Sequence, residues 1–248
     1  MAETESAETK PTEAVMEAAT PAVAQEEKKA EPKRRRRSGS KEEGATQSGS
    51  ALFEKYPVEE IKVLDSSVVD YINPSGRSYP NIFGRRKHGA YYDTHISVTE
   101  RLINKLMRGG TGKKVGGKVI RTKGRLQGKK LKVMHIVEDA FEIINKRTGK
   151  NPLQVLVNAI ENAAPIEDTT RVRYGGISYN VAVGISSKRR VDVALRNIAL
   201  ASLTSAFKKR KKLSEALADE LMLASDKAPD SYAIKKRIEA ERIARRAR

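Results

Sequence analysis

The chain has 248 residues, with 49 lysines and arginines against 31 aspartates and glutamates, so that its formal net charge is +18 and its isoelectric point is near 10. This excess of positive charge predicts a polyanionic partner, because bound phosphates offset the self-repulsion of the protein. The absence of cysteine excludes disulfides, thiolate metal sites and a cysteine nucleophile. We found neither a signal-peptide pattern nor an apolar run of about 18 residues, and we therefore expect a cytoplasmic protein with no membrane partner.

Residues 1–50 differ in composition from the rest of the chain. Alanine, glutamate, threonine, serine and proline dominate them, and all twelve aromatic residues follow residue 50. Such a segment buries too little apolar surface to offset the entropy of ordering it. We predict a disordered extension over residues 1–50, first acidic and then basic at residues 32–37, and a folded domain over residues 51–248.

Six stretches of the predicted domain repeat apolar residues at helical spacing. The first opens with a possible capping box, Ser97 and Glu100, and the third has Pro152 in its first turn and Pro165 at its end. The stretches are residues 97–107, 131–147, 151–165, 189–212, 213–225 and 230–248. Short links join most of them, which predicts a mainly α fold, a bundle of about six helices.

Two stretches interrupt this pattern. Residues 108–130 hold seven glycines and nine basic residues, and their glycine content argues against a continuous helix. Residues 171–186 alternate apolar and polar residues around Gly175 and Gly176, which favours a two-residue turn because both glycines accept a positive φ. We therefore expect one β-hairpin protruding from the helices.

Basic residues recur at four separated places: 85–88, 108–130, 171–190 and 207–212. This spread differs from a single DNA-recognition helix and favours a surface that fits a folded RNA through phosphate contacts. Single clusters have simpler explanations, since 108–130 could be a solvated loop and 207–212 a cationic helix end. The candidate RNA-binding residues are Arg85, Arg86, Lys87, His88, Lys113, Lys114, Lys118, Arg121, Lys123, Arg125, Lys188, Arg189, Arg190, Lys208, Lys209 and Arg210.

The hairpin supplies a second group of candidates. Arginines can contact phosphates, and tyrosines either pack the stem or stack on unpaired bases. The sequence leaves these two roles of the tyrosines open. The hairpin candidates are Arg171, Arg173, Tyr174, Gly175, Gly176 and Tyr179.

No pattern points to catalysis, a metal or a cofactor. The histidines are His88, His95 and His135, and no two of them have the spacing of a helical metal site. The glycines and lysines near residue 112 lack the spacing and the hydroxyl residue of a phosphate-binding loop. We expect a protein without enzymatic activity. Two alternatives remain: a DNA-associated or chromatin-type basic protein, and a metal-independent nuclease that uses one of the histidines.

The order of these elements resembles the universal small-subunit ribosomal protein family numbered seven, in its archaeal and eukaryotic branch. The resemblance rests on SVTERLINKLM, GKNPLQVLVNAIENAAP, RVRYGGISYNVAVGISSKRR and ALRNIALASLTSAFKKRKKLSEALADELMLAS, and on the ending SYAIKKRIEAERIARRAR. It covers roughly residues 53–248. The basic stretch 108–130 is longer than the bacterial linker, and the short forms lack the 50-residue prefix.

This resemblance implies a structural protein that binds the 3′ major domain of small-subunit ribosomal RNA and helps to organise the head of the subunit. The bundle and the segment near residues 85–88 would bind ribosomal RNA. The hairpin, with its tip at Gly175 and Gly176, would reach toward the exit-site transfer RNA and the messenger RNA path. Neighbouring small-subunit ribosomal proteins would be further partners.

Overall fold

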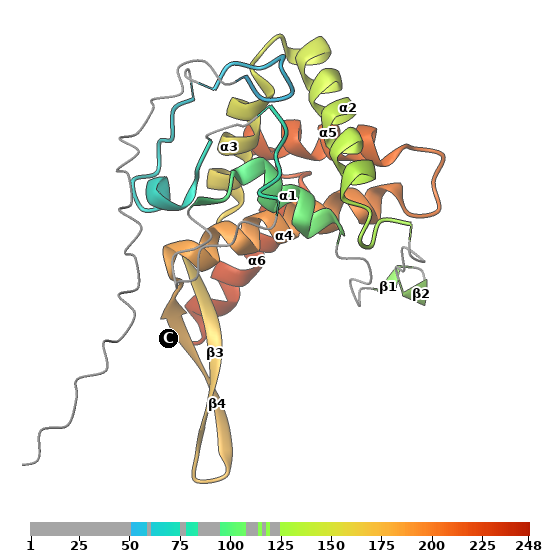
Figure 1. Ribbon diagram of the computed structural model, residues 1–248. Coiled ribbons are helices and arrows are strands. Elements are labelled where there is room, and N and C mark those ends of the chain that lie inside the picture. Colours follow the sequence, from blue (N-terminus) through green and yellow to red (C-terminus); the bar gives the residue numbers. More distant parts are fainter. Residues whose placement is uncertain are drawn as a thin grey trace, which may run out of the picture. The chain divides into compact units, whose positions relative to one another are not determined.

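The computed structural model describes residues 51–58, 61–74, 78–83, 95–107 and 125–248, and the backbone of residues 114–115 and 118–119. All of these belong to one compact unit, Thr46–Arg248. The predicted extension, residues 1–50, lies outside the described residues. The elements, labelled in Figure 1, are η1 (Val69–Tyr71), α1 (Val98–Met107), β1 (Lys114–Val115), β2 (Lys118–Val119), α2 (Lys130–Thr148), α3 (Pro152–Ala163), β3 (Glu167–Tyr174), β4 (Ile177–Gly184), α4 (Ser187–Ala206), α5 (Leu213–Ser225) and α6 (Tyr232–Arg246).

The predicted fold class is confirmed: the protein is mainly α, and its described residues form six α-helices and a long antiparallel hairpin between α3 and α4. The hairpin is longer at its root than predicted, because residues 167–170 pair with residues 181–184. The structure also contains a short antiparallel pair, β1 and β2, within the glycine-rich stretch. The sequence did not predict this pair, since two-residue strands are too short to show a period of two.

Side chains cap the starts of helices α1 and α3. At α1, the Ser97 hydroxyl accepts a hydrogen bond from the Glu100 amide (3.2 Å). The Glu100 carboxylate does not complete the expected capping box and instead accepts hydrogen bonds from Lys130 and the Ile82 amide. At α3, Asn151 caps the helix by accepting from the Leu153 amide (3.0 Å), and Pro152 occupies the first turn as predicted.

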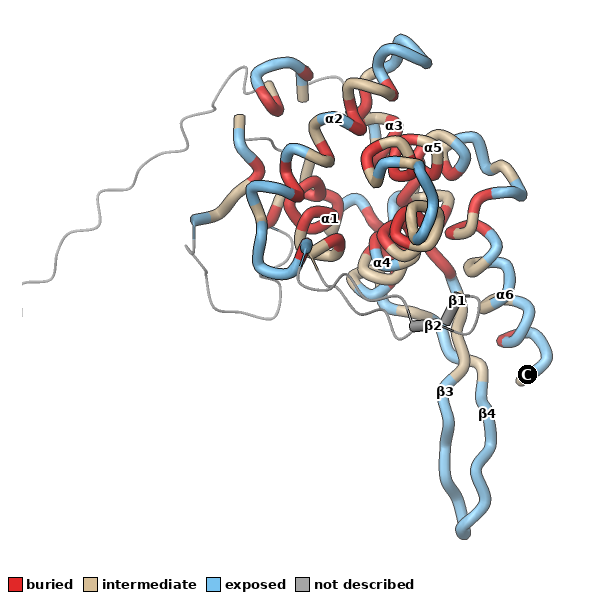
Figure 2. The backbone as a smooth tube through the Cα atoms, turned by 90° about the vertical axis from the view of Figure 1, so that its right-hand side faces the viewer, coloured by how far each residue is buried: buried red, intermediate tan, exposed pale blue. Residues whose placement is uncertain are grey.

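The predicted apolar stripes meet in one core, which Figure 2 shows as buried segments where the helices pack together. Helix α5 packs against α2, α3 and α4, and α1 packs against α4 and α2. All predicted stripe residues of the first four helices are buried: Val98, Leu102, Leu106, Val133, Val137, Ala140, Phe141, Ile144, Leu153, Leu156, Val157, Ile160, Val191, Leu195, Ile198 and Ala201.

The segment before η1 closes one side of this core. Phe53 and Tyr56 both meet the ring of Phe141 edge-on, with ring centroids 6.2 Å apart in each case. Lys55, between them, forms ion pairs with Glu138 and Glu142 on α2. The N-terminal part of the described chain is therefore held on α2 by apolar and ionic contacts.

Helix α6 packs along the root of the hairpin, and the rest of the hairpin projects beyond the helices (Figures 1 and 2). The Ile166 amide donates to the Glu241 carboxylate of α6 (3.4 Å), and Arg248 pairs with Glu167 at the start of β3. The root is thus fixed on the bundle, while residues 170–181 are exposed to solvent.

Candidate nucleic-acid interface

The hairpin is a regular two-stranded ribbon whose two faces differ in chemistry. Residues that pair directly across the strands lie on the same face, and the faces alternate along each strand. Arg171 pairs with Asn180 and Arg173 with Ser178, so one face of the outer ribbon is polar and basic. Both arginines are exposed, and neither has an ion pair with another described residue. This face suits contact with phosphates.

The opposite face of the ribbon is apolar and aromatic. Tyr174 pairs with Ile177 and Val172 with Tyr179, and none of these side chains packs into the core. Tyr174 is 83% exposed and Tyr179 53% exposed. The tyrosines therefore do not serve to bury the stem in the bundle, and both rings are accessible for stacking on unpaired bases.

The tip of the hairpin has the predicted geometry. Gly175 (φ 58°) and Gly176 (φ 83°) both adopt the left-handed conformation. They connect Tyr174 to Ile177, the last residue pair of the ladder. Two consecutive positive φ angles are typical of the turn that matches the twist of a two-residue hairpin. The candidate tip residues thus have a conformational role in holding the two strands.

Arg190, one of the candidate RNA-binding residues, is buried at the root of the hairpin. Its guanidinium donates to the Pro165 carbonyl (3.2 Å), to the hydroxyl of Ser67 and to the carboxylate of Asp65 (2.9 Å). The hydrogen bond from Ser67 and the charge of Arg190 hold the pKa of Asp65 below its ordinary value. These bonds join α4 to the segment before η1 and to the α3–β3 link. We therefore exclude Arg190 from the proposed RNA surface, because its donors are used inside the protein.

The neighbouring candidates differ from Arg190 in exposure. Arg189 is exposed, and Lys188 is half-buried in the first turn of α4. Arg125 is exposed in the turn that precedes α2. Arg189 and Arg125 form no ion pair with any described residue, so their charge is available to an external partner.

The basic cluster 207–212 is a loop, because α4 ends at Ala206 and α5 begins at Leu213. Lys208, Lys209 and Arg210 are exposed, and Lys208 has a positive φ of 57°. Lys211 differs, since it pairs with Asp219 on α5. The three exposed residues fit the predicted contact surface. They also follow the C-terminus of α4 directly, where the helix dipole favours cations, so the alternative of a cationic helix end stays open.

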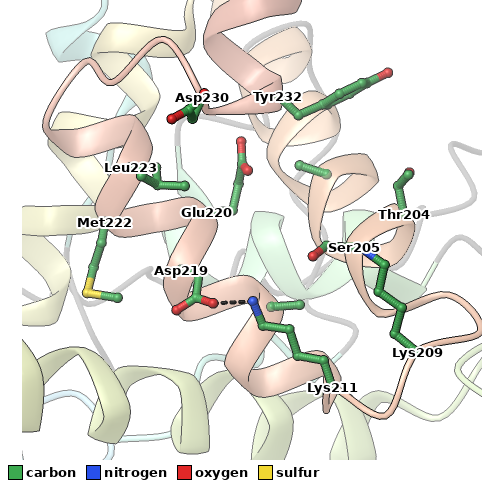
Figure 3. A pocket seen from close by; sticks show the side chains of 12 residues that line it. Thr204, Ser205, Lys209, Lys211, Asp219, Glu220, Met222, Leu223, Asp230 and Tyr232 are labelled. Carbon is green, nitrogen blue, oxygen red and sulfur yellow. Dashed lines mark hydrogen bonds and ion pairs between the residues drawn. The ribbon is translucent and has the colours of Figure 1, made fainter.

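A pocket of about 500 Å³ lies between the end of α4, α5 and the start of α6 (Figure 3). Asp219, Glu220 and Asp230 line it, together with Lys209 and Lys211. The carboxylates outnumber the lysines, and Asp219 already binds Lys211, as the dashed line in Figure 3 marks. This pocket is therefore a poor site for a phosphate.

Residues 85–88, with Arg85, Arg86, Lys87 and His88, lie outside the described residues, as do Lys113, Arg121 and Lys123. Lys114 and Lys118 are on β1 and β2, where the ladder sets Lys114 opposite Val119 and Lys118 opposite Val115. Their backbone is thus part of a small antiparallel ribbon.

The sequence-based candidates did not include three exposed arginines of α6. Arg242, Arg245 and Arg246 lie on its solvent side, and none has an ion pair with another described residue. The signal in the sequence was their spacing of three and four residues, which places them on adjoining parts of one helix surface. The sequence alone could not separate them from Arg237, whose guanidinium donates to the Asn162 carbonyl (2.7 Å).

Within the described residues, no group of three or more histidines, aspartates and glutamates is arranged to hold a metal ion. His95 is exposed ahead of α1, His135 is exposed on α2, and His88 lies outside the described residues. None of the described helices combines the length and the apolar character that crossing a bilayer requires.

Comparison with known proteins gives a consistent match over most of the chain. Residues 77–248 match the model of the family described as ribosomal protein S7p/S5e. The chain is 44% identical over 198 residues to the small ribosomal subunit protein uS7 of Methanothermobacter thermautotrophicus, which covers 80% of this chain and 99% of that protein. It is 43% identical to uS7 of Methanosphaera stadtmanae (79% of this chain, 97% of that protein) and 40% identical to uS7 of Archaeoglobus fulgidus (83% and 98%).

Proposed function

Because the chain belongs to the ribosomal protein S7p/S5e family, we propose that it binds the 3′ major domain of small-subunit ribosomal RNA and helps to organise the head of the subunit. The chain is a structural, non-enzymatic constituent of the small ribosomal subunit, of archaeal type, and its place is the cytoplasmic ribosome. Its partners are small-subunit ribosomal RNA and other ribosomal proteins. We propose two further details: the chain binds the 3′ major domain of this RNA, and its hairpin extends toward the exit-site transfer RNA and the messenger RNA path.

The mechanism follows from charge held at fixed positions. Exposed cations such as Arg125, Arg189 and Arg210 lie on or beside helices that one apolar core fixes relative to each other. Each cation that meets a phosphate releases condensed counterions, which favours binding. A rigid set of cations favours the RNA fold whose phosphates match it, so that early binding would guide assembly of the head.

The hairpin is the second part of the proposal: it reaches toward the exit-site transfer RNA and the messenger RNA path. One observation supports this role, the exposure of the whole outer ribbon, residues 170–181, beyond the bundle. A ribbon with arginines on one face and tyrosines on the other offers donors for phosphates and rings for bases. Nothing in the described part of the bundle uses these side chains.

Because the chain belongs to this family, we reject the alternative of a DNA-associated or chromatin-type protein. Because the family is structural and non-enzymatic, we also reject the nuclease alternative. The described helices also contain no single recognition helix in which the basic residues concentrate. Exposed cations occur instead on α2, α4 and α6, in the hairpin and in the loops between the described elements.

A competition experiment tests the proposal. The full chain is bound to a labelled transcript of the 3′ domain of small-subunit ribosomal RNA, and unlabelled transcript or duplex DNA of equal length is added. We expect the transcript to compete at far lower concentration than the DNA. Equal competition by the duplex DNA would contradict the proposal.

A hairpin variant tests the second part. Replacing Arg171 and Arg173 by glutamine should weaken crosslinking of the hairpin to transfer RNA in assembled subunits, without lowering the melting temperature of the free protein. The control is replacement of Lys62, in the segment before η1, and Lys146, on α2, both of which are exposed. Unchanged transfer-RNA crosslinking in the hairpin variant would contradict a role at the exit site.

A further inference from the structure

Helix α6 carries two kinds of cation, which the structure separates. Lys235 pairs with Asp230, Lys236 with Glu239 and Arg237 with Glu241. Arg248, two residues beyond the end of the helix, pairs with Glu167. Arg242, Arg245 and Arg246 are exposed and have no such partner among the described residues. Three unneutralised arginines within five residues repel one another, which is a cost unless an anion binds them.

The helix dipole does not account for all three arginines. Cations in the last turn of a helix are stabilised by the partial negative charge of its C-terminus, and Arg245 and Arg246 lie in that turn. Arg242 lies one turn earlier, where the effect has largely decayed. Four residues of helix rise about 6 Å, so that the three guanidinium groups form one compact basic patch.

From this arrangement we propose that the exposed face of α6 binds the phosphate backbone of a double-helical RNA segment. This proposal rests on the function proposed above and adds a binding surface to it. The exposed residues of α6 include no aromatic side chain, so this face offers no ring for stacking on unpaired bases, and its arginines favour contact with phosphates. Bidentate arginines suit phosphates, and RNA duplexes are recognised mainly through shape and backbone contacts.

The patch continues onto the basic face of the hairpin. Arg248 binds Glu167, and Glu167 shares a face of β3 with Arg171 and Arg173 because alternate residues of a strand point the same way. The C-terminus lies beside the hairpin root in both views (Figures 1 and 2). At about 3.3 Å per residue, Arg171 is about 13 Å and Arg173 about 20 Å beyond Glu167. An RNA backbone bound at α6 can therefore extend along the arginine face of the ribbon.

The test replaces the three arginines by glutamine in the full chain, R242Q, R245Q and R246Q together. The probes are an RNA duplex of about 20 base pairs with an unrelated sequence and the 3′-domain transcript. Binding is measured between about 50 and 200 mM salt. We expect roughly tenfold weaker binding of the duplex, and a salt slope smaller by about one for each phosphate that the variant no longer neutralises.

Two further variants separate the α6 patch from general charge and from folding. Replacing Lys62, Lys146 and Lys150 by glutamine removes the same charge from exposed sites. Lys146 is in the last turn of α2, Lys150 lies between α2 and α3, and the backbone of Lys62 binds Gln154 in the first turn of α3. The turn between α2 and α3 lies at the end of the bundle away from the hairpin (Figure 1). This control should bind the duplex within about twofold of wild type. Changing the three α6 arginines to lysine should retain most of the affinity and of the salt slope.

Equally weakened binding in the α6 variant and the lysine control, or unchanged binding in the α6 variant, would overturn the inference. The outcome is independent of the competition experiment above. If wild type fails to prefer the ribosomal transcript over duplex DNA, the proposed function fails whatever α6 does. If the wild-type protein prefers the ribosomal transcript but the α6 variant binds the RNA duplex as tightly as the lysine control does, the proposed function stands and only the proposed role of α6 is wrong.

Discussion

At the scale of single residues, Arg190 shows how an arginine in a basic run can be structural. It is adjacent to Arg189 in the first turn of α4, yet successive helix residues point about 100° apart, so that one faces the core and the other faces solvent. Its acceptor Asp65 is 125 residues away in the chain. The sequence predicted both arginines as RNA ligands because it contains no signal for so distant a partner.

Replacing Arg190 by alanine should destabilise the fold by about 1–3 kcal/mol, because the Pro165 carbonyl would lose the donor that Arg190 supplies and Asp65 would lose its ion pair, although Asp65 keeps its hydrogen bonds from Ser67. Urea denaturation of the free protein measures this. Replacing the exposed Arg189 by alanine is the matched control and should change stability by no more than about 0.5 kcal/mol. Equal effects of the two substitutions would show that the hairpin root does not depend on Arg190.

Asp192 gives a prediction about pH. Its burial opposes ionisation, but the hydrogen bond from Lys105 (3.0 Å) and the charges of Lys105 and Arg101 together keep its pKa below the ordinary value of 3.8. A carboxyl whose pKa is lower in the folded protein stabilises the fold above its unfolded pKa. This stabilisation is lost as the pH falls through the folded pKa.

We therefore expect Asp192→Asn to lower stability by about 1 kcal/mol at pH 7 and to have a progressively smaller effect below about pH 3. Denaturation of wild type and variant at both pH values measures the difference. Asp230→Asn is the control, because Asp230 is 86% exposed and 3.9 Å from Lys235, and it should have little effect at either pH. A difference for Asp192→Asn that grows on acidification would contradict the assignment.

At the scale of elements, the helices and the long hairpin could be predicted because local signals and tertiary packing agree. In α3, the cap Asn151, Pro152 and the apolar stripe all favour the same helix, and the core buries that stripe. The two tip glycines specified the hairpin turn. The extent of the hairpin was less predictable, since residues 167–170 read EDTT and have no apolar alternation, and their pairing depends on β4 and on the contact of α6 with β3.

The turn of the hairpin should tolerate alanine poorly, although there is space for it. A Cβ at Gly175 or Gly176 would meet no atom within 4 Å, so the cost of about 1–2 kcal/mol per residue comes from the positive φ alone. We expect Gly176→Ala to increase amide hydrogen exchange along the outer hairpin while the melting temperature of the bundle stays constant. Gly184→Ala, which also has open space but no positive φ, should leave exchange unchanged. Equal exchange in the two variants would contradict this account of the tip.

At the scale of the whole molecule, the function depends on how cations are distributed between internal ion pairs and the surface. Composition predicted a polyanionic partner, and family membership identifies it as small-subunit ribosomal RNA. Composition could not show which cations are free. Lys55 and Arg147 are neutralised by carboxylates on other elements, whereas Arg242 and Arg210 have no ion pair with a described residue.

The bundle and the hairpin contribute to this distribution in different ways. The core fixes the bundle, and the hairpin leaves it with both faces exposed. The family resemblance predicted this division from the order of the motifs. Alternation along β3 already places Arg171 and Arg173 on the face opposite Tyr174, whereas the position of Tyr179 on the same face as Tyr174 follows from the strand register. The α6 patch likewise depends on the structure, because only the ion pairs of Lys236 and Arg237 distinguish the neutralised cations of α6 from its exposed arginines.

The most direct test of the account is a density map of the small ribosomal subunit assembled with this chain, at a resolution that shows side chains. We predict that the bundle contacts the 3′ major domain of the ribosomal RNA, that Arg242 and Arg246 face RNA phosphates, and that the hairpin tip at Gly175 and Gly176 points to the exit site. A map in which the bundle binds another RNA domain, or in which the hairpin is buried away from the transfer-RNA path, would contradict the account.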